Sequence, residues 1–208
     1  MVEPPFVLFV WFVVPSAARP ILSAMRHALV IHTSSVCPPV TAIAVEASRA
    51  TASQLDLAYE LTGEIAGLFV PSRAQSRRTD ELWKRTCFEA FVLPEGGEAY
   101  LELNLAPSTR WAAYRFDSHR QGMRDAAEIA PLDIHPRVAP GRLSLGASFD
   151  LGVLPGFDIE ADWRIGLTAV IEAADGRISY WSLAHPLEKP EFHHSGGWIG
   201  RLPNPERA

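Results

Sequence analysis

Acidic, amide and aromatic residues recur at alternate positions in three segments between residues 87 and 115, the spacing that places side chains on one face of a β-strand. The Gly96-Gly97 turn and a four-residue loop at 107–110 are expected to fold these segments into an antiparallel meander. One face of it would carry Cys87, Glu89, Phe91, Tyr100, Glu102, Asn104, Trp111 and Arg115. Carboxylates and amides can bond pairs of hydroxyl groups, and flat aromatic rings can stack on the C–H face of a sugar. These residues therefore predict a carbohydrate-binding face.

Two other interpretations of this face stay open. It could be a solvated outer face on which Glu102 and Arg115 form a cross-strand ion pair, worth about 0.2–1 kcal/mol. Alternatively, Glu89 and Glu102 could be the paired carboxylates of a glycan-acting enzyme, since pairs roughly 5–10 Å apart hydrolyse glycosidic bonds. The neighbouring arginine favours ionised, structural carboxylates over that catalytic role.

The segment from Trp181 to His194 contains three of the seven histidines, His185, His193 and His194, together with two prolines, a composition typical of a loop. Its spacing matches no zinc motif, although imidazole and carboxylate groups are zinc-type ligands. We therefore expect no metal site, and we expect His185 and His193 to hold the loop or to contact a ligand. Cys87 is expected to be a buried structural thiol.

Short strand-like segments must position these residues, and they recur along the whole chain. They are expected at 28–32, 41–46, 54–62, 64–70, 86–93, 99–106, 111–116, 127–135, 142–150, 164–172 and 177–183. Only 120–127 has a short helical pattern. The sequence therefore predicts an all-β protein, an antiparallel β-sandwich of Ig-like or jelly-roll type with at most short helices.

A second hairpin is expected around Asp175-Gly176, because this pair suits a two-residue type I′ turn. Such a turn would place Val170 opposite Trp181 and Ile171 opposite Tyr180. Displacing either hairpin by one residue would move every side chain to the other face of its strand. The predicted binding face therefore depends on turn geometry.

Length and charge set broader limits on function. The 208 residues fit one domain at 25–208, and the net charge of −5 excludes a protein that binds the phosphate backbone of nucleic acid. Two cysteines exclude a disulfide framework and a four-cysteine zinc site. No stretch has the roughly 20 apolar residues that a membrane span needs.

Residues 1–24 raise a separate question. The apolar run 6–14 and the small residues 16–18 that follow it have the form of a signal peptide, but no basic residue precedes the run. The segment could instead be an extension upstream of a start at Met25, or a segment docked on the domain. Translation from Met25 would favour a cytoplasmic protein, and a signal peptide would mean export.

Three stretches resemble the DOMON-like domains, which are grouped with family 9 carbohydrate-binding modules. They are LWKRTCFEAFV (82–92), YLELNLAPSTRWAAYRFDSHRQGM (100–123) and YWSLAHPLEKPEFHH (180–194). The resemblance covers roughly 25–202 and implies a β-sandwich that binds a ligand without catalysing a reaction. It also implies a sugar ring held between Trp111 and Trp181. Some relatives bind haem, for which His119, His185 or Met123 would lie near the iron.

Three functional hypotheses result. The leading one is a non-catalytic module that binds carbohydrate and needs no cofactor. The alternatives are a b-type haem redox module and a glycan-acting enzyme. The predicted ligand-binding residues are Glu89, Tyr100, Glu102, Asn104, Trp111, Arg115, Trp181, His185 and His193.

Overall fold

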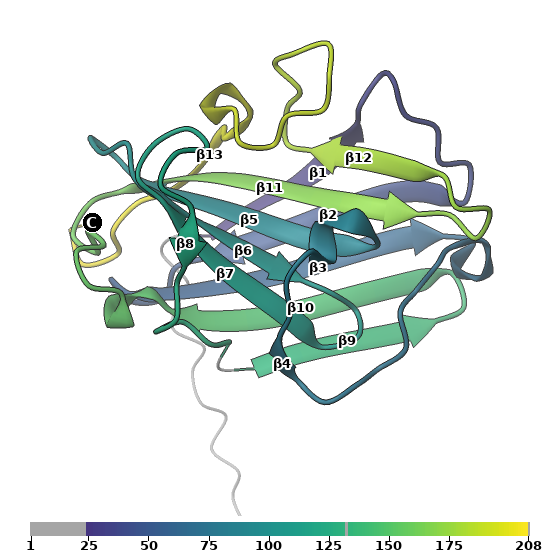
Figure 1. The fold of residues 1–208 in the computed structure, drawn as a ribbon, viewed down its shortest axis with the longest axis horizontal. Coiled ribbons are helices and arrows are strands. Elements are labelled where there is room, and N and C mark those ends of the chain that lie inside the picture. The colour runs from purple at the N-terminus through teal and green to yellow at the C-terminus, as the bar shows by residue number, and fades with distance from the viewer. Residues whose placement is uncertain (1–23, 132, 208) are drawn as a thin grey trace, which may run out of the picture.

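A computed structural model describes residues 24–131 and 133–207 (Figure 1). The strands are β1 (Ala24–Ile31), β2 (Val40–Ser48), β3 (Gln54–Gly63), β4 (Arg77–Arg78), β5 (Cys87–Pro94), β6 (Tyr100–Leu105), β7 (Arg110–Phe116), β8 (Arg124–Asp125), β9 (Asp133–Ala139), β10 (Arg142–Asp150), β11 (Trp163–Glu172), β12 (Ile178–Ser182) and β13 (Gly200–Leu202). Four short 3-10 helices accompany them, η1 (Ile65–Gly67), η2 (Leu82–Lys84), η3 (Leu151–Val153) and η4 (Ser195–Gly197).

The expected helix at 120–127 is wrong, because β8 lies there. In the described ranges no helix has the length and apolar character to cross a membrane. The hypotheses for residues 1–23 lie outside the described residues.

The strands form two layers that share β1. The first sheet has the order β1-β2-β3-β10-β9, and the second has the order β4-β7-β6-β5-β11-β12-β1. Residues 24–29 of β1 pair with β2, whereas Val30 and Ile31 pair with β12. All these pairs are antiparallel except the two-residue pair of β4 with β7. The predicted all-β sandwich is confirmed.

The main core lies between the layers, where β5 crosses β3 (Figure 1). The ring of Phe88 lies 4.9 Å from that of Tyr59, whose hydroxyl donates to the carbonyl oxygen of Glu89 at 2.6 Å. Strand β10 buries only alternate residues, as expected of a strand with one wet face, but β5 is buried at every position. The outer face of β5 must therefore be covered.

A second apolar cluster covers that outer face. Its members, the outer cluster from here on, are Phe91, Leu93, Tyr100, Ala112, Tyr114, Phe116 and Trp198. Phe192 of the C-terminal segment 183–199 and Trp83 of η2 pack against its rim. This C-terminal segment therefore lies across the second sheet and brings distant residues onto it.

Gly166 of β11 makes this covering possible. It pairs with Phe91, and a methyl group at Gly166 would overlap the indole ring of Trp198. The Trp198 ring stacks on Phe91 with their centroids 5.5 Å apart, and its Nε1 donates to the Phe192 carbonyl oxygen at 2.7 Å. The missing side chain therefore lets the indole lie directly on the sheet and anchor the segment.

Two of the three predicted hairpin registers are displaced by one residue. The β5–β6 register is confirmed, with Glu89 opposite Asn104. In the β6–β7 pair, however, Glu102 faces Tyr114 rather than Arg115. In the β11–β12 pair, Ala169 faces Trp181 and Val170 faces Tyr180.

The same kind of turn explains both errors. Each hairpin closes through a three-residue loop, 107–109 or 174–176, whose third residue has a positive φ: Thr109 at 70° and Gly176 at 85°. A type I turn followed by one left-handed residue is the usual three-residue hairpin loop. The expected loops had four and two residues. An odd difference in loop length exchanges the two faces of the strand that follows.

We predict that Gly166→Ala destabilises the protein by about 1–3 kcal/mol, the usual effect of forcing extra volume into a packed site. Gly146→Ala is the matched control, because a methyl group there meets nothing closer than the Leu57 carbonyl oxygen at 3.8 Å. Urea unfolding measures both variants. Equal stability of the two would contradict the anchoring role of Trp198.

Candidate functional site

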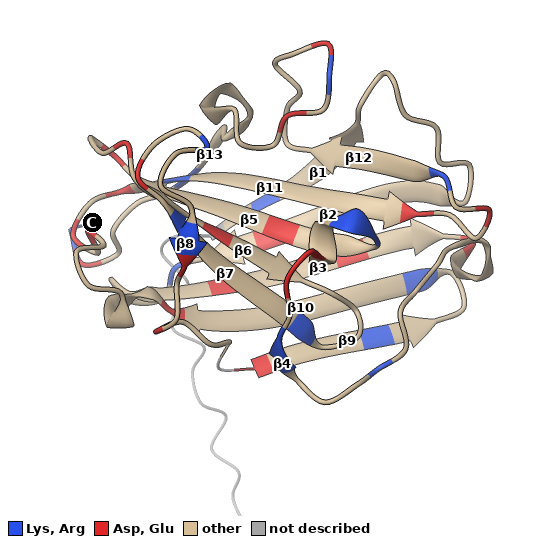
Figure 2. Ribbon diagram, viewed as in Figure 1, with Lys and Arg blue, Asp and Glu red and all other residues tan. Residues whose placement is uncertain are grey.

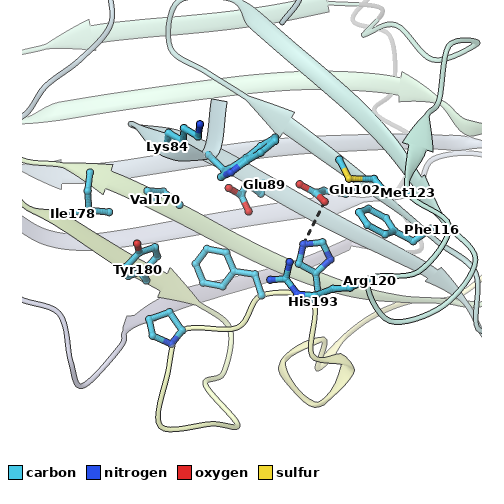
Figure 3. A pocket seen from close by; sticks show the side chains of 13 residues that line it. Lys84, Glu89, Glu102, Phe116, Arg120, Met123, Val170, Ile178, Tyr180 and His193 are labelled. Carbon is cyan, nitrogen blue, oxygen red and sulfur yellow. Dashed lines mark ion pairs between the residues drawn. The ribbon is translucent and has the colours of Figure 1, made fainter. Parts of the chain in front are cut away.

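A pocket of about 540 Å³ lies on the outer side of the second sheet, beside the outer cluster (Figure 3). Its walls come from η2 and from the C-terminal segment, and its floor comes from β5 and β6. This volume falls within the range of about 300–1,000 Å³ typical of small-ligand pockets. Figure 3 shows Glu102, Arg120 and His193 on one side of it and Val170, Ile178 and Tyr180 on the other.

Two buried carboxyl groups, Glu89 and Glu102, line the pocket floor. Figure 2 shows their acidic positions on the neighbouring strands β5 and β6. Glu89 faces Asn104 across the strand pair, and Glu102 lies two residues before Asn104 on β6. Glu102 is therefore the diagonal neighbour of Glu89 on the same face of the sheet. Oε2 of Glu89 accepts from Thr168 Oγ1 at 3.2 Å, and Oε1 of Glu102 accepts from Asn104 Nδ2 at 2.6 Å. Oε1 of Glu89 is buried and has no hydrogen-bond partner among the described residues. The floor is therefore acidic and incompletely hydrogen-bonded.

Burial makes both carboxyl groups weak acids. It raises the pKa of Glu102 to about 7, although the Asn104 amide and the Arg120 charge act in the opposite direction. The pKa of Glu89 is raised well above its usual range by burial and then by the charge of Glu102. Near neutral pH the pair therefore holds protons that solvent-exposed carboxyls would have lost.

His193 closes the pocket above Glu102. Its Nδ1 is 2.8 Å from the Tyr100 hydroxyl and its Nε2 is 3.6 Å from Glu102 Oε2. Burial and the nearby Arg120 charge lower the pKa of His193 to about 4, so its ring is neutral at pH 7. The contacts favour the tautomer with the proton on Nε2, facing the carboxyl group. The contact with Tyr100 ties the C-terminal segment to β6, and the same ring lines the pocket, so both expected roles of His193 stay open.

Aromatic rings supply the walls. Phe192 comes from the C-terminal segment, and its ring centroid lies 6.0 Å from that of Tyr180. Trp83 of η2 is half-buried and meets Tyr114 edge to face, with centroids 5.9 Å apart. Sequence reasoning missed Trp83, although a large aromatic residue beside the polar stretch 72–81 was a usable signal.

Both cations on the pocket wall have carboxylate partners elsewhere. Lys84 Nζ lies 2.7 Å from Glu81 Oε1, and Arg120 pairs with Glu191 at 2.9 Å. Neither of these acids lines the pocket. Arg120 also adopts a positive φ of 54°, and its backbone N–H donates to the Tyr100 hydroxyl at 3.2 Å. Sequence reasoning did not single out these two cations.

The structure brings five of the nine predicted site residues together. They are Glu89, Tyr100, Glu102, Asn104 and His193. Glu89, Glu102 and His193 line the pocket, and the other two hold their polar groups in place.

The other four, Trp111, Arg115, Trp181 and His185, lie elsewhere. Trp111 and Arg115 are on the opposite face of β7, where Trp111 packs against the main core and Arg115 pairs with Glu128 at 3.5 Å. Trp181 is in the main core and donates from Nε1 to Ser179 Oγ at 3.0 Å. The predicted aromatic pair around one cleft is therefore wrong, as is the ion pair between Glu102 and Arg115. Both follow from the displaced registers.

The remaining histidines and the cysteine have structural contacts. The imidazole of His185 bonds to the Val30 carbonyl oxygen at 2.9 Å, and that of His119 lies 3.2 Å from the His193 carbonyl oxygen. Met123 is exposed at the pocket rim, and the haem hypothesis stays untested. Burial raises the pKa of Cys87, as expected of a structural thiol. In the described ranges, no three metal-ligating side chains gather into a cluster.

The fold has known counterparts. A candidate carbohydrate-binding protein from Bacteroides uniformis matches with a TM-score of 0.61 at 14% identity, over 86% of this chain and 85% of that one. A family 9 carbohydrate-binding module from Caldicellulosiruptor kristjanssonii is also similar, in complex with glucose (TM-score 0.45, 8% identity) and with cellotriose (0.49, 10%). The match to the glucose complex covers 84% of this chain and 83% of the module, and the match to the cellotriose complex covers 86% and 82%.

No protein-family model and no curated protein sequence matches the chain. At 14% identity, the similarity to the Bacteroides protein establishes a shared fold. The β-sandwich that the sequence resemblance implied is thus confirmed, while a relation to the DOMON-like domains stays a prediction.

We predict that Glu102→Gln becomes more stable relative to the wild type as the pH rises. The carboxyl group has a pKa of about 7 in the folded protein and about 4.5 when unfolded, so the folded state binds its proton more tightly. The wild type therefore loses stability as pH rises from 4.5 to 7, by up to about 3 kcal/mol, and the amide variant does not. Urea unfolding at several pH values measures the difference.

Glu64→Gln is the control, because Glu64 is exposed. Its stability relative to the wild type should change little over the same range. A pH-independent difference between Glu102→Gln and the wild type would contradict the proposed burial of an ionisable group.

Proposed function

We propose that this protein binds carbohydrate, without chemical conversion, in the pocket between η2 and the C-terminal segment. The observation that carries the proposal is the combination of aromatic walls and planar polar groups around one small cavity. Trp83 and Phe192 offer ring faces or edges, and Glu89, Glu102 and His193 offer oxygen and nitrogen atoms. Sugars need both kinds of contact, because each ring has apolar C–H faces and a belt of hydroxyl groups.

The polar groups are held before a ligand arrives. Asn104 fixes Glu102, Thr168 fixes Glu89, and Tyr100 fixes His193. Preorganised groups lose little conformational entropy when they bind. The fold shared with a candidate carbohydrate-binding protein gives independent support for this proposal.

The positions of the two acids favour binding over hydrolysis. Glycoside hydrolysis needs carboxyl groups on both sides of the scissile bond, one to protonate the leaving oxygen and one to act from the opposite face. Glu89 and Glu102 project from the same face of one sheet (Figure 3). They are the only acids among the described residues that line the pocket, so no carboxyl group comes from the opposite wall.

We predict that Trp83→Ala weakens binding of a glycan found on a soluble panel by about tenfold or more, roughly 1.4 kcal/mol. The loss is expected because the indole would no longer stack on the sugar. Trp111→Ala, on the opposite face of β7, should keep the wild-type affinity. Isothermal titration calorimetry measures the binding, and chromatography of the glycan after incubation should recover it intact.

Unchanged affinity in Trp83→Ala would refute this pocket as the binding site. Cleavage of the glycan by the wild type would refute the non-catalytic role. Circular dichroism of both tryptophan variants checks that each remains folded.

A further inference from the structure

We propose that the ligand of this pocket carries an ammonium group that binds between Glu89 and Glu102, and that an amino sugar is therefore its preferred class of carbohydrate. This inference rests on the proposed carbohydrate function. It adds the charge of the ligand and the two residues that recognise it.

One carboxyl oxygen of Glu89 has no hydrogen-bond partner among the described residues. The residue is 2% exposed, and its Oε1 lacks a donor within the described part of the chain, although Oε2 has one from Thr168. A buried polar atom without a partner destabilises the protein, and a charged group does so more strongly. Because Glu89 lines the pocket, a ligand can supply the missing donor.

The charges inside the pocket also favour a cationic ligand. Lys84 and Arg120 line the wall, but each already pairs with an acid that lies outside the lining. Within the described ranges, the one ion-pair distance for Glu102 is to the neutral ring of His193 at 3.6 Å, while the Arg120 charge acts on it without an ion-pair contact. Glu89 has no cation partner there. Ionisation of the two acids would leave net negative charge that a neutral sugar could not offset.

The groups around the two acids are arranged to suit an ammonium ion. An ammonium group has three donors, so it can bond to Glu89 and Glu102 at the same time, as diagonal neighbours on one face. Aromatic rings of Trp83, Phe116 and Phe192 border the same space, and such rings attract cations through their electron-rich faces. Carboxylates below and aromatic rings around the sides form a setting suited to a protonated amine.

Matched ligands test the amine directly. Calorimetry at pH 7 compares glucosamine, glucose and N-acetylglucosamine, which share one ring and differ in the group at one carbon. Cyclohexylamine and cyclohexanol form a second pair without sugar hydroxyls. We expect glucosamine to bind at least tenfold more tightly than the other two sugars, and cyclohexylamine to bind more tightly than cyclohexanol.

The variants identify the residue that recognises the amine. Glu89→Gln keeps the shape and removes the charge, and it should reduce the affinity for glucosamine to that for glucose. Glu64→Gln, on the exposed surface, should keep the tenfold preference. Thermal unfolding should show Glu89→Gln folded and no less stable than the wild type, because burial disfavours the ionised acid.

Proton release provides a second readout. An ammonium ion stabilises ionised carboxylates, so its binding should release protons near pH 7 and should strengthen as pH rises from 6 to 8. Cyclohexylamine suits this pH series because its amine stays protonated between pH 6 and 8. The titratable and charged groups around the two acids are His193, Arg120, Lys84, Cys87, Tyr59 and Tyr100. The pKa of His193 is lowered to about 4 and the pKa values of Cys87 and Tyr59 are raised, so these three groups should not titrate between pH 6 and 8.

The outcomes separate this inference from the proposed function. Equal affinity for glucose and glucosamine would overturn the ammonium site and leave carbohydrate binding standing. Binding of cyclohexylamine that Glu89→Gln abolishes, without binding of any sugar, would support the ammonium site and refute the carbohydrate function. Binding of no probe would overturn both.

Discussion

The contact between Trp198 and Gly166 is the one on which the rest of the site depends. The indole ring lies on the second sheet because Gly166 has no side chain, and Phe91 stacks beside it. This contact places the C-terminal segment across β5, so that His193 and Phe192 reach the acids of strands far away in the sequence. Without it, the outer cluster would be an apolar surface exposed to water.

The buried acids impose the second constraint. Removing carboxyl groups from water disfavours their charge, and it raises the pKa of Glu102 to about 7. In a protein core, buried polar groups normally have hydrogen-bond partners for all their polar atoms. Here Asn104 donates to one oxygen of Glu102 and Thr168 to one oxygen of Glu89, and the second oxygen of Glu89 has no partner among the described residues. Perturbed acids with spare capacity beside a cavity are typical of a binding site.

Turn geometry decided which side chains share a face. The Gly96-Gly97 hairpin was predicted in its correct register, and with it the pairing of Glu89 with Asn104. The β6–β7 loop has one residue fewer than predicted and the β11–β12 loop has one residue more, because Thr109 and Gly176 take left-handed conformations that close three-residue loops. Threonine is uncommon there, so its sequence signal was weak. The error removed Trp111 and Trp181 from the predicted site.

The sequence by itself determined the sandwich, the approximate positions of most of its longer strands and the acidic pair on one face, because alternation of side chains is a local property of a strand. It did not predict β4, β8 or β13, it placed β9 too early, and the strand expected at 64–70 is wrong because η1 lies there. It also indicated that the histidine-rich segment is a loop. Only the tertiary structure decided that this loop lies over Glu102 and that Trp83 faces the same cavity. These contacts join residues about 20 to 90 positions apart, and they depend on packing of the outer cluster rather than on any local pattern.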